Sequence, residues 1–178
     1  MCVLSYAGFL RYSDLVNLKF SNVTFEETHV KLQIDKSKTD VYRDGKGVLI
    51  SKTGNVTCPV NILNRYIQCS KEEKESNEYL FRGLTFKKST NNYVFRKTKL
   101  SYTRGREIVI KAFKDVGFNV KNICTHSLRA GGASAAANAG INDRLFKRHG
   151  RWSSEKAKDM YVKDDMQSLL SVSLGLGI

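Results

Sequence analysis

Apolar and polar positions repeat with two different periods along this chain, and the change of period predicts where strands and helices lie. Residues 29–35 alternate apolar and polar side chains, which predicts a strand with one buried face. Asp44-Gly45 is a turn signal, and the apolar run at 48–50 supplies a returning strand. Residues 29–51 are therefore predicted to form a β-hairpin.

Most of the remaining chain carries the helical period. Ser13 is predicted to cap a short helix with Asp14 in its first turn, and Pro59 is predicted to open a longer one. Residues 84–100 show no clear period. Further helices are predicted at about 102–116, 125–139, 142–149, 154–162 and 164–172. The predicted fold class is mainly α with a small antiparallel β-hairpin sheet (α+β).

Length and composition favour one globular domain. The chain has 178 residues, of which 41% are hydrophobic and 26% are charged. It contains no apolar run long enough to cross a membrane and no secretory signal pattern. The four cysteines never form a C-x-x-C pair, which favours free thiols in a reducing compartment: Cys2, Cys58, Cys69 and Cys124. We therefore expect an intracellular protein without a membrane segment.

The charge balance is strongly basic. Thirty Lys and Arg residues face 17 Asp and Glu residues, which gives a formal net charge of +13. Such a charge fits either a polyanion partner or a surface that is simply well solvated. Clustering of the basic residues favours a phosphate-facing side, since acidic residues gather elsewhere, at 72–78. The clusters are Lys36, Lys38, Arg43 and Lys46; Lys87, Lys88, Arg96, Lys97, Lys99, Arg104 and Arg106; and Arg144, Lys147, Arg148 and Arg151.

Several residues could carry chemistry, although most of them have an ordinary structural explanation when taken alone. His126 and Arg129 lie three residues apart, so on a helix both side chains could reach one phosphate. Arg11 sits in a break between apolar segments, where an arginine is costly to bury without an anion. Trp152 and Tyr161 have an ordinary explanation as core residues, because aromatic side chains on amphipathic helices usually pack inside.

The order of these residues changes their interpretation. An arginine, a hairpin lysine, H-x-x-R, a tryptophan and a tyrosine nine residues later resemble the catalytic set of the tyrosine recombinases, the phage integrase family. The matching segments are GFLRYSDLVNL, KSKTDVYRDGKGV, THSLRAGGASAAANAG and HGRWSSEKAKDMYVKD. The last two are especially similar to recombinases of animal DIRS-like and Crypton-like mobile elements. The resemblance spans essentially the whole chain and implies the catalytic-domain fold of that family.

The resemblance also implies a role for each matching residue. Arg11 and Arg129 would neutralise the non-bridging oxygens of a DNA phosphodiester, with Asp14 bracing the first arginine. Tyr161 would be the nucleophile and Lys38 the general acid for the departing 5′ oxygen. His126 would assist proton transfer, and Trp152 would donate a hydrogen bond or pack the site. The implied enzyme is a metal-independent DNA recombinase or integrase that uses no cofactor, and no Asp/Glu/His cluster with metal spacing is present.

The implied partner is double-stranded DNA, bound by a homo-oligomer that forms a synaptic tetramer. The expected location is the nucleus. The predicted DNA-binding residues are Lys36, Arg43, Lys147, Arg148, His149 and Arg151. Apolar residues after Tyr161 would form a tail helix that packs either on its own domain or on a neighbouring protomer: Leu169, Leu170, Val172 and Leu174.

One departure from the family pattern concerns the N-terminus. Only ten residues precede Arg11, so residues 1–178 are expected to be a catalytic domain truncated at its N-terminus, without the family's N-terminal core-binding domain. Two alternatives to a recombinase stay open: a type IB topoisomerase-like domain, and a catalytically inactive DNA-binding relic or domesticated integrase domain. The H-x-x-R motif and the Trp-to-Tyr spacing favour the recombinase.

Overall fold

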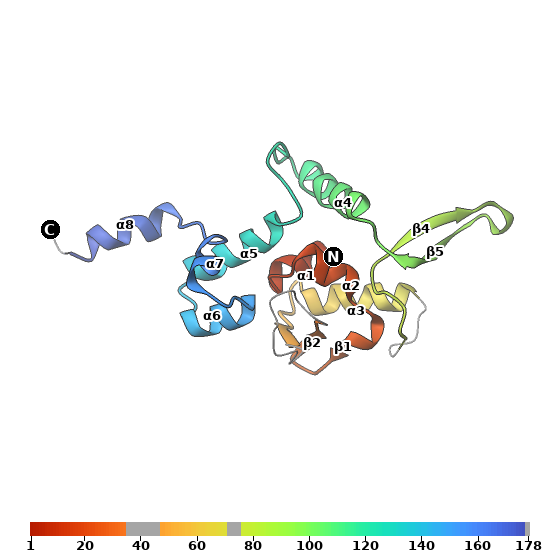
Figure 1. Ribbon diagram of the computed structural model, residues 1–178, viewed down its shortest axis with the longest axis horizontal. Helices are drawn as coiled ribbons and strands as arrows, with labels where there is room; N and C mark the ends of the chain where they lie inside the picture. Colours follow the sequence, from red (N-terminus) through yellow and green to blue (C-terminus); the bar gives the residue numbers. More distant parts are fainter. Residues whose placement is uncertain (35–46, 71–75, 177–178) are drawn as a thin grey trace.

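The computed structural model describes residues 1–34, 47–70 and 76–176. Helices and small sheets form a central body, a helical group on one side of it and a projecting hairpin on the other (Figure 1). No helix within these ranges is long and apolar enough to cross a membrane. The mainly α fold with small antiparallel sheets confirms the predicted class.

The central body packs three helices around a three-stranded sheet. The helices are α1 (Cys2–Ala7), α2 (Tyr12–Asn17) and α3 (Pro59–Ser70), and a 3₁₀ turn η1 (Phe20–Asn22) leads into the sheet. The strands β1 (Val23–Phe25), β2 (His29–Gln33) and β3 (Gly47–Ser51) are antiparallel in that order. Val30 and Leu32 are buried opposite Ile50 and Val48, so both strands of the predicted hairpin are confirmed. The predicted turn at Asp44-Gly45 lies outside the described residues.

The segment without a clear period forms a second, two-stranded sheet. Strands β4 (Arg82–Lys87) and β5 (Asn92–Lys99) pair antiparallel across the 3₁₀ turn η2 (Lys88–Thr90). The pair projects away from the body (Figure 1). Both strands are exposed over most of their length, so neither face produces a burial pattern. Helix α4 (Tyr102–Asp115) follows where it was predicted, with Gly105 and Val109 as its buried residues.

Four helices form the C-terminal group: α5 (Ser127–Asn138), α6 (Asp143–Gly150), α7 (Glu155–Asp159) and α8 (Met166–Leu174). The prediction that α7 extends to residue 162 was wrong. The helix ends at Asp159, and Tyr161 lies in the turn that follows, where its backbone N–H donates to the carbonyl of Lys158 at 2.9 Å.

Two apolar clusters hold the protein together, and the end of α1 connects them. The larger cluster fills the central body. The smaller one contains Phe9, Ala133, Phe146 and Trp152, with Tyr161 packed against it. Helices α1 and α5 approach so closely that a Cβ atom on Gly132 would lie 2.2 Å from the carbonyl oxygen of Tyr6. The segment after α1 therefore sits between the two clusters, next to the candidate catalytic residues.

Candidate active site

The connection between α1 and α2 carries the first candidate arginine. Arg11 is the N-cap residue of α2, and its backbone N–H donates to Oδ2 of Asp14 at 2.9 Å. This carboxylate caps the helix at its third position, where negative charge interacts favourably with the helix dipole. The prediction that Ser13 caps the helix was therefore wrong, because the helix begins at Tyr12.

Arg129 is the centre of the site. It lies in the first turn of α5 and is fully buried, with 0% of its surface exposed. Nη1 donates to the carbonyl of Phe9, and Nη2 donates to the carbonyl of Gly150 at 2.8 Å. The guanidinium lies over two aromatic rings, 5.0 Å from the ring centre of Trp152 and 4.8 Å from that of Tyr161. The side chain thus links α1, the end of α6 and the turn after α7.

Other positive charges surround Arg129. Burial is the largest cause that lowers its pKa, to about 10, and the guanidinium groups of Arg11 and Arg151 lower it further. Arg129 is still a cation at neutral pH. The three guanidinium groups are therefore close enough to repel one another, and the buried one, that of Arg129, lies over the ring of Tyr161.

Arg151 contributes the third guanidinium through an inward-facing side chain. Its Nη2 donates to Oδ2 of Asp14 at 3.0 Å and to the carbonyl of Phe9 at 3.3 Å. Its Nη1 donates to the carbonyls of Gly8 and His149, each at 3.3 Å. The side chains of Arg151 and Asp14 are 8% and 6% exposed, so this ion pair is buried. Burial lowers the pKa of Arg151, whereas Asp14 raises it.

The two aromatic candidates meet across the turn that follows α7. The ring centres of Trp152 and Tyr161 are 5.7 Å apart, and Trp152 also packs against Phe9 and Phe146. Trp152 and Tyr161 lie nine residues apart in the sequence. The short helix α7 between them returns the chain to the same apolar cluster. The structure therefore brings together Arg11, Asp14, Arg129, Trp152 and Tyr161 from four separate places in the sequence.

Within the described residues, no ion pair or ring contact joins the predicted catalytic residue His126 to this group. His126 is exposed in the turn before α5, and among the described residues no hydrogen bond reaches its ring. Lys38, Lys36 and Arg43 lie outside the described residues. Their predicted roles as general acid and DNA contacts stay predictions.

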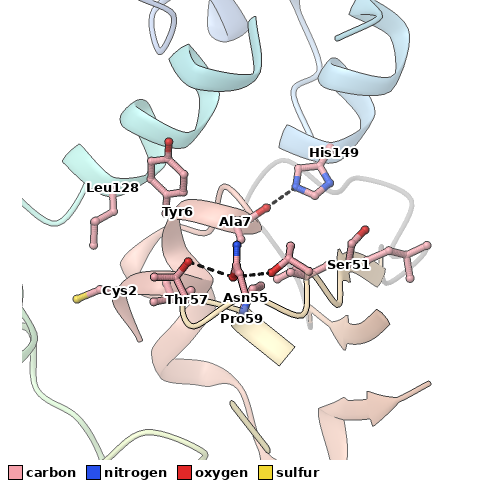
Figure 2. A pocket seen from close by; sticks show the side chains of 13 residues that line it. Cys2, Tyr6, Ala7, Ser51, Asn55, Thr57, Pro59, Leu128 and His149 are labelled. Atoms are coloured by element: carbon pink, nitrogen blue, oxygen red, sulfur yellow. Dashed lines mark hydrogen bonds between the residues drawn. The ribbon is translucent and has the colours of Figure 1, made fainter. Parts of the chain in front are cut away.

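The predicted DNA-binding residues of α6 differ in placement. Arg148 is exposed, whereas Lys147 is half-buried and pairs with Glu155. His149 is also half-buried, and its Nε2 lies 2.9 Å from the carbonyl oxygen of Ala7 (Figure 2). Burial lowers the pKa of His149, so its ring is neutral at neutral pH and Nε2 donates to that carbonyl. His149 and Arg151 therefore both turn into the protein and attach α6 to the end of α1.

A cavity opens on the other side of His149. It has a volume of about 670 Å³ and lies between α1, strand β3 and the segment before α3 (Figure 2). Cys2, Tyr6, Ile50 and Leu128 are among its mostly apolar lining residues, and none of the three clustered arginines lines it. The charged site and this apolar cavity are separate features.

Sequence reasoning missed the role of Arg151. It expected Asp14 to brace Arg11, and the carboxylate does bond to the Arg11 backbone, but its charged partner is Arg151. The arrangement depends on Phe9 and Arg151, which both adopt left-handed backbone conformations with φ of 46° and 56°. No sequence signal marks them. The preceding residue, Gly150, is helical, and it has to be glycine because a Cβ there would lie 1.9 Å from the ring of Trp152.

The chain is similar to known proteins over most of its length. A family model described as "Phage integrase family" matches residues 1–168. A protein described as an integrase/recombinase xerD homolog from Selenomonas ruminantium is 28% identical over 161 residues, which cover 90% of this chain and 45% of the relative. The chain thus spans about half the length of the curated relative that it matches.

Solved structures show the same fold. The XerH site-specific recombinase, bound to a palindromic difH substrate in a post-cleavage complex, matches with a TM-score of 0.71 and 14% identity, over 97% of this chain and 43% of that one. The XerA recombinase matches with a TM-score of 0.68 and 20% identity, over 98% and 55%. The Tn1549 transposon integrase, in complex with circular intermediate DNA, gives a TM-score of 0.60 at 16% identity, over 97% and 55%. The named relatives are Xer recombinases and a transposon integrase, so the narrower likeness to DIRS-like or Crypton-like elements is not what these comparisons establish.

Proposed function

This chain belongs to the phage integrase family of tyrosine recombinases, and we propose that it cleaves and rejoins DNA strands through a covalent 3′-phosphotyrosyl intermediate. One observation carries the proposal: the guanidinium group of Arg129 lies over the ring of Tyr161, and those of Arg11 and Arg151 lie close enough to lower its pKa. Within this described group, one carboxylate, that of Asp14, forms an ion pair. The charge excess of the group is 3 − 1 = +2. Such a site favours an anion, and a phosphodiester supplies one.

The proposed reaction exchanges one phosphate ester for another. The phenolic oxygen of Tyr161 attacks phosphorus and forms a P–O bond, and the bond from phosphorus to the 5′ oxygen breaks. The departing 5′ oxygen takes a proton from Lys38, and His126 accepts the proton of the phenol. Arg11 and Arg129 stabilise the charge that grows on the non-bridging oxygens. Attack by a 5′ hydroxyl on the phosphotyrosine reverses these steps and rejoins the strand.

The described conformation has to change before a phosphate reaches Arg129. Its guanidinium has no exposed surface and is covered by Trp152 and Tyr161. Tyr161 lies in a turn outside α7, so its ring can move without unwinding a helix. We infer that binding of DNA displaces this ring from the guanidinium and directs the phenol toward the phosphate.

Double-stranded DNA is the partner that the basic surface favours, since the chain carries a formal charge of +13. Two of the structural relatives are described as complexes with a difH substrate or with transposon circular intermediate DNA. Assembly of several copies on DNA, nuclear location and an origin in a DIRS-like or Crypton-like mobile element are further proposals, which rest on the sequence resemblance.

A second candidate function is DNA binding without chemistry. Complete burial of Arg129 favours it, because a guanidinium that stays covered by Tyr161 binds no phosphate. The two candidates share the same DNA-binding surface but differ in one product, a covalent bond between protein and DNA.

Detection of that bond tests the proposal. The full chain is incubated with a pool of nicked duplexes of random sequence in EDTA, and protein that migrates with labelled DNA is counted after denaturation. We expect an adduct from the wild type and none from Tyr161→Phe, which keeps the aromatic ring but lacks the nucleophile. EDTA leaves the adduct intact because arginines stabilise the charge. DNA binding without any adduct would favour the inactive module, and loss of the adduct in EDTA would contradict the two-arginine mechanism.

A further inference from the structure

The carboxylate of Asp14 accepts hydrogen bonds from two arginines. Oδ2 of Asp14 accepts the backbone N–H of Arg11 at 2.9 Å and Nη2 of Arg151 at 3.0 Å. Arg11 and Asp14 are the N-cap and third residue of the same helix, so their side chains lie next to each other. Asp14 is therefore within reach of the Arg11 guanidinium as well as that of Arg151.

The guanidinium of Arg11 nevertheless stays unpaired within the described part of the chain. No hydrogen bond or ion pair to its side chain occurs among those residues, although Arg11 is half-buried. Its charge lies close enough to Arg129 and Arg151 to lower the pKa of each. Repulsion from two neighbouring cations would favour a turn of this side chain toward a free carboxylate. Arg151 occupies that carboxylate.

Arg151 also fixes the backbone that holds Arg129. The carbonyl of Phe9 accepts Nη1 of Arg129 and Nη2 of Arg151. Both Phe9 and Arg151 hold left-handed backbone conformations, which non-glycine residues adopt at an energetic cost. The two strained residues thus lie at the two ends of one contact, and that contact positions the oxygen to which Arg129 donates.

We propose that Arg151 is a positioning residue, which keeps the Asp14 carboxylate away from the Arg11 guanidinium and so leaves Arg11 available to neutralise the DNA phosphate. This inference rests on the proposed DNA cleavage. The side chain of Arg151 is 8% exposed and bonds to the protein, so it acts indirectly. Its effect passes through Asp14 to Arg11 and through the Phe9 carbonyl to Arg129.

Three variants separate the steps. Arg151→Ala frees Asp14 to pair with Arg11, so we expect adduct formation to slow about 100-fold, the cost of a small misplacement of a group at the reacting centre. Affinity for DNA should stay within about threefold, because Arg151 is buried. Adding Asp14→Asn removes the competing charge but retains an oxygen that caps α2, so the double variant should recover most of the rate. Arg65→Ala, which removes an exposed arginine of α3 outside the predicted basic clusters, is the matched control and should not slow cleavage.

A neutral substrate distinguishes positioning from a merely structural role. A methylphosphonate at the scissile position lacks the negative charge that Arg11 would neutralise. If Arg151 acts by keeping Arg11 available, the defect of Arg151→Ala should be large on the phosphate and small on the methylphosphonate. A loosened fold would slow both substrates equally. Thermal unfolding checks each variant. If the alanine variant fails to fold, Arg151→Gln, which keeps a long polar side chain but removes the charge beside Asp14, carries the same comparison.

Each result decides the question. Recovery in the double variant together with a defect confined to the charged phosphate supports the inference. Equal defects on both substrates, or no recovery when Asp14 is replaced, overturn it while the recombinase proposal stands. Absence of any adduct from the wild-type chain contradicts the recombinase proposal itself and removes the role of Arg151 with it.

Discussion

Arg129 shows how a single buried cation can organise a site. Two backbone carbonyls, from Phe9 and Gly150, accept its Nη groups, and the rings of Trp152 and Tyr161 lie 5.0 and 4.8 Å from its guanidinium. Carbonyl oxygens and aromatic faces stabilise a positive charge without neutralising it. The protein therefore retains a full cation in its interior. Lysine could not replace it, since one ammonium group lacks the planar fork that reaches both carbonyls.

The residue whose role stays least constrained is the general acid. Lys36 and Lys38 both lie in residues 35–46, outside the described structure, and they project to the same side if the strand continues. The family resemblance selects Lys38. An acid matters only when the leaving group is poor. Lys38→Ala should therefore strongly slow cleavage of ordinary DNA but barely affect DNA whose 5′ bridging oxygen is replaced by sulfur, because a thiolate leaves without a proton.

Cleavage rates of both lysine variants on both substrates test this assignment. Lys36→Ala is the matched control and should lose a phosphate contact to a similar extent on oxygen and sulfur DNA. An equal defect of Lys38→Ala on both substrates would make Lys38 a positioning charge. Sulfur rescue of Lys36→Ala alone would move the acid to Lys36.

The packing of helix α5 against α1 depends on one small residue. Gly132 faces α1, and a Cβ there would lie 2.2 Å from the carbonyl oxygen of Tyr6, a backbone atom that has little room to move. We expect Gly132→Ala to lower the free energy of unfolding by about 1–3 kcal/mol through overpacking. Separation of α1 from α5 would also move the Phe9 carbonyl away from Arg129, so adduct formation should fall.

The preceding glycine supplies the control. A Cβ on Gly131 would meet the ring of Tyr6 at 3.5 Å, an ordinary contact, and the residue is exposed. Gly131→Ala should therefore stabilise the helix by up to about 1 kcal/mol. Urea unfolding of both variants measures the difference. Equal tolerance of both substitutions would show that α1 and α5 do not pack closely in solution.

The β4–β5 hairpin carries part of the predicted basic surface. Residues 82–99 contain six basic residues and no acidic one, and nearly all of them are exposed. The double variant Lys87→Ala/Lys97→Ala should weaken DNA binding and reduce the slope of log affinity against log salt by about 2, since each phosphate contact contributes about 0.9. Fluorescence anisotropy over a salt series measures this slope. The control Lys111→Ala/Lys114→Ala removes the same charge from α4, outside the predicted clusters, and should leave the slope unchanged. Equal slopes in the wild type and both double variants would exclude the hairpin from the DNA interface.

The elements also show what the sequence can reveal. The β2–β3 pair was predictable because one face is buried, as Val30 and Leu32 show, and burial imposes a period of two. The β4–β5 pair was not, because exposed strands need no apolar alternation. Residue types and their order predicted Arg129, Trp152 and Tyr161 as members of one site, and the structure brings these three side chains into contact. The ion pair between Asp14 and Arg151 spans 137 residues and depends on left-handed backbone at two non-glycine positions, and neither leaves a local pattern.

At the scale of the whole molecule, the site joins two separately packed parts. The larger apolar cluster lies in the N-terminal body, and Phe9 carries the chain from it into the smaller C-terminal cluster. Arg129 and Arg151 attach to the carbonyl of that same residue. The charge of the site and the connection between the two clusters therefore depend on the same few contacts, so damage to this junction should affect stability and chemistry together.

The tail helix lies outside this junction. Helix α8 extends away from the other helices (Figure 1), and its apolar side chains remain exposed: Leu169, Leu170, Val172 and Leu174. Because none of its residues is buried, deletion of residues 166–178 should leave the melting temperature of the domain nearly unchanged. An exposed apolar stripe of this kind favours docking onto a second copy. The truncated chain should therefore bind DNA but form smaller assemblies on it.

Sedimentation of the protein–DNA complexes measures this effect, and point variants locate it on the helix. Leu170→Ser/Leu174→Ser changes the apolar stripe and should reduce assembly as the deletion does. Ser171→Ala/Ser173→Ala changes polar positions of the same helix and should leave assembly intact, which separates loss of the stripe from a general loss of helix. A lower melting temperature with unchanged assembly after the deletion would show instead that the tail packs on its own domain, and the stripe would then stabilise the fold in cis.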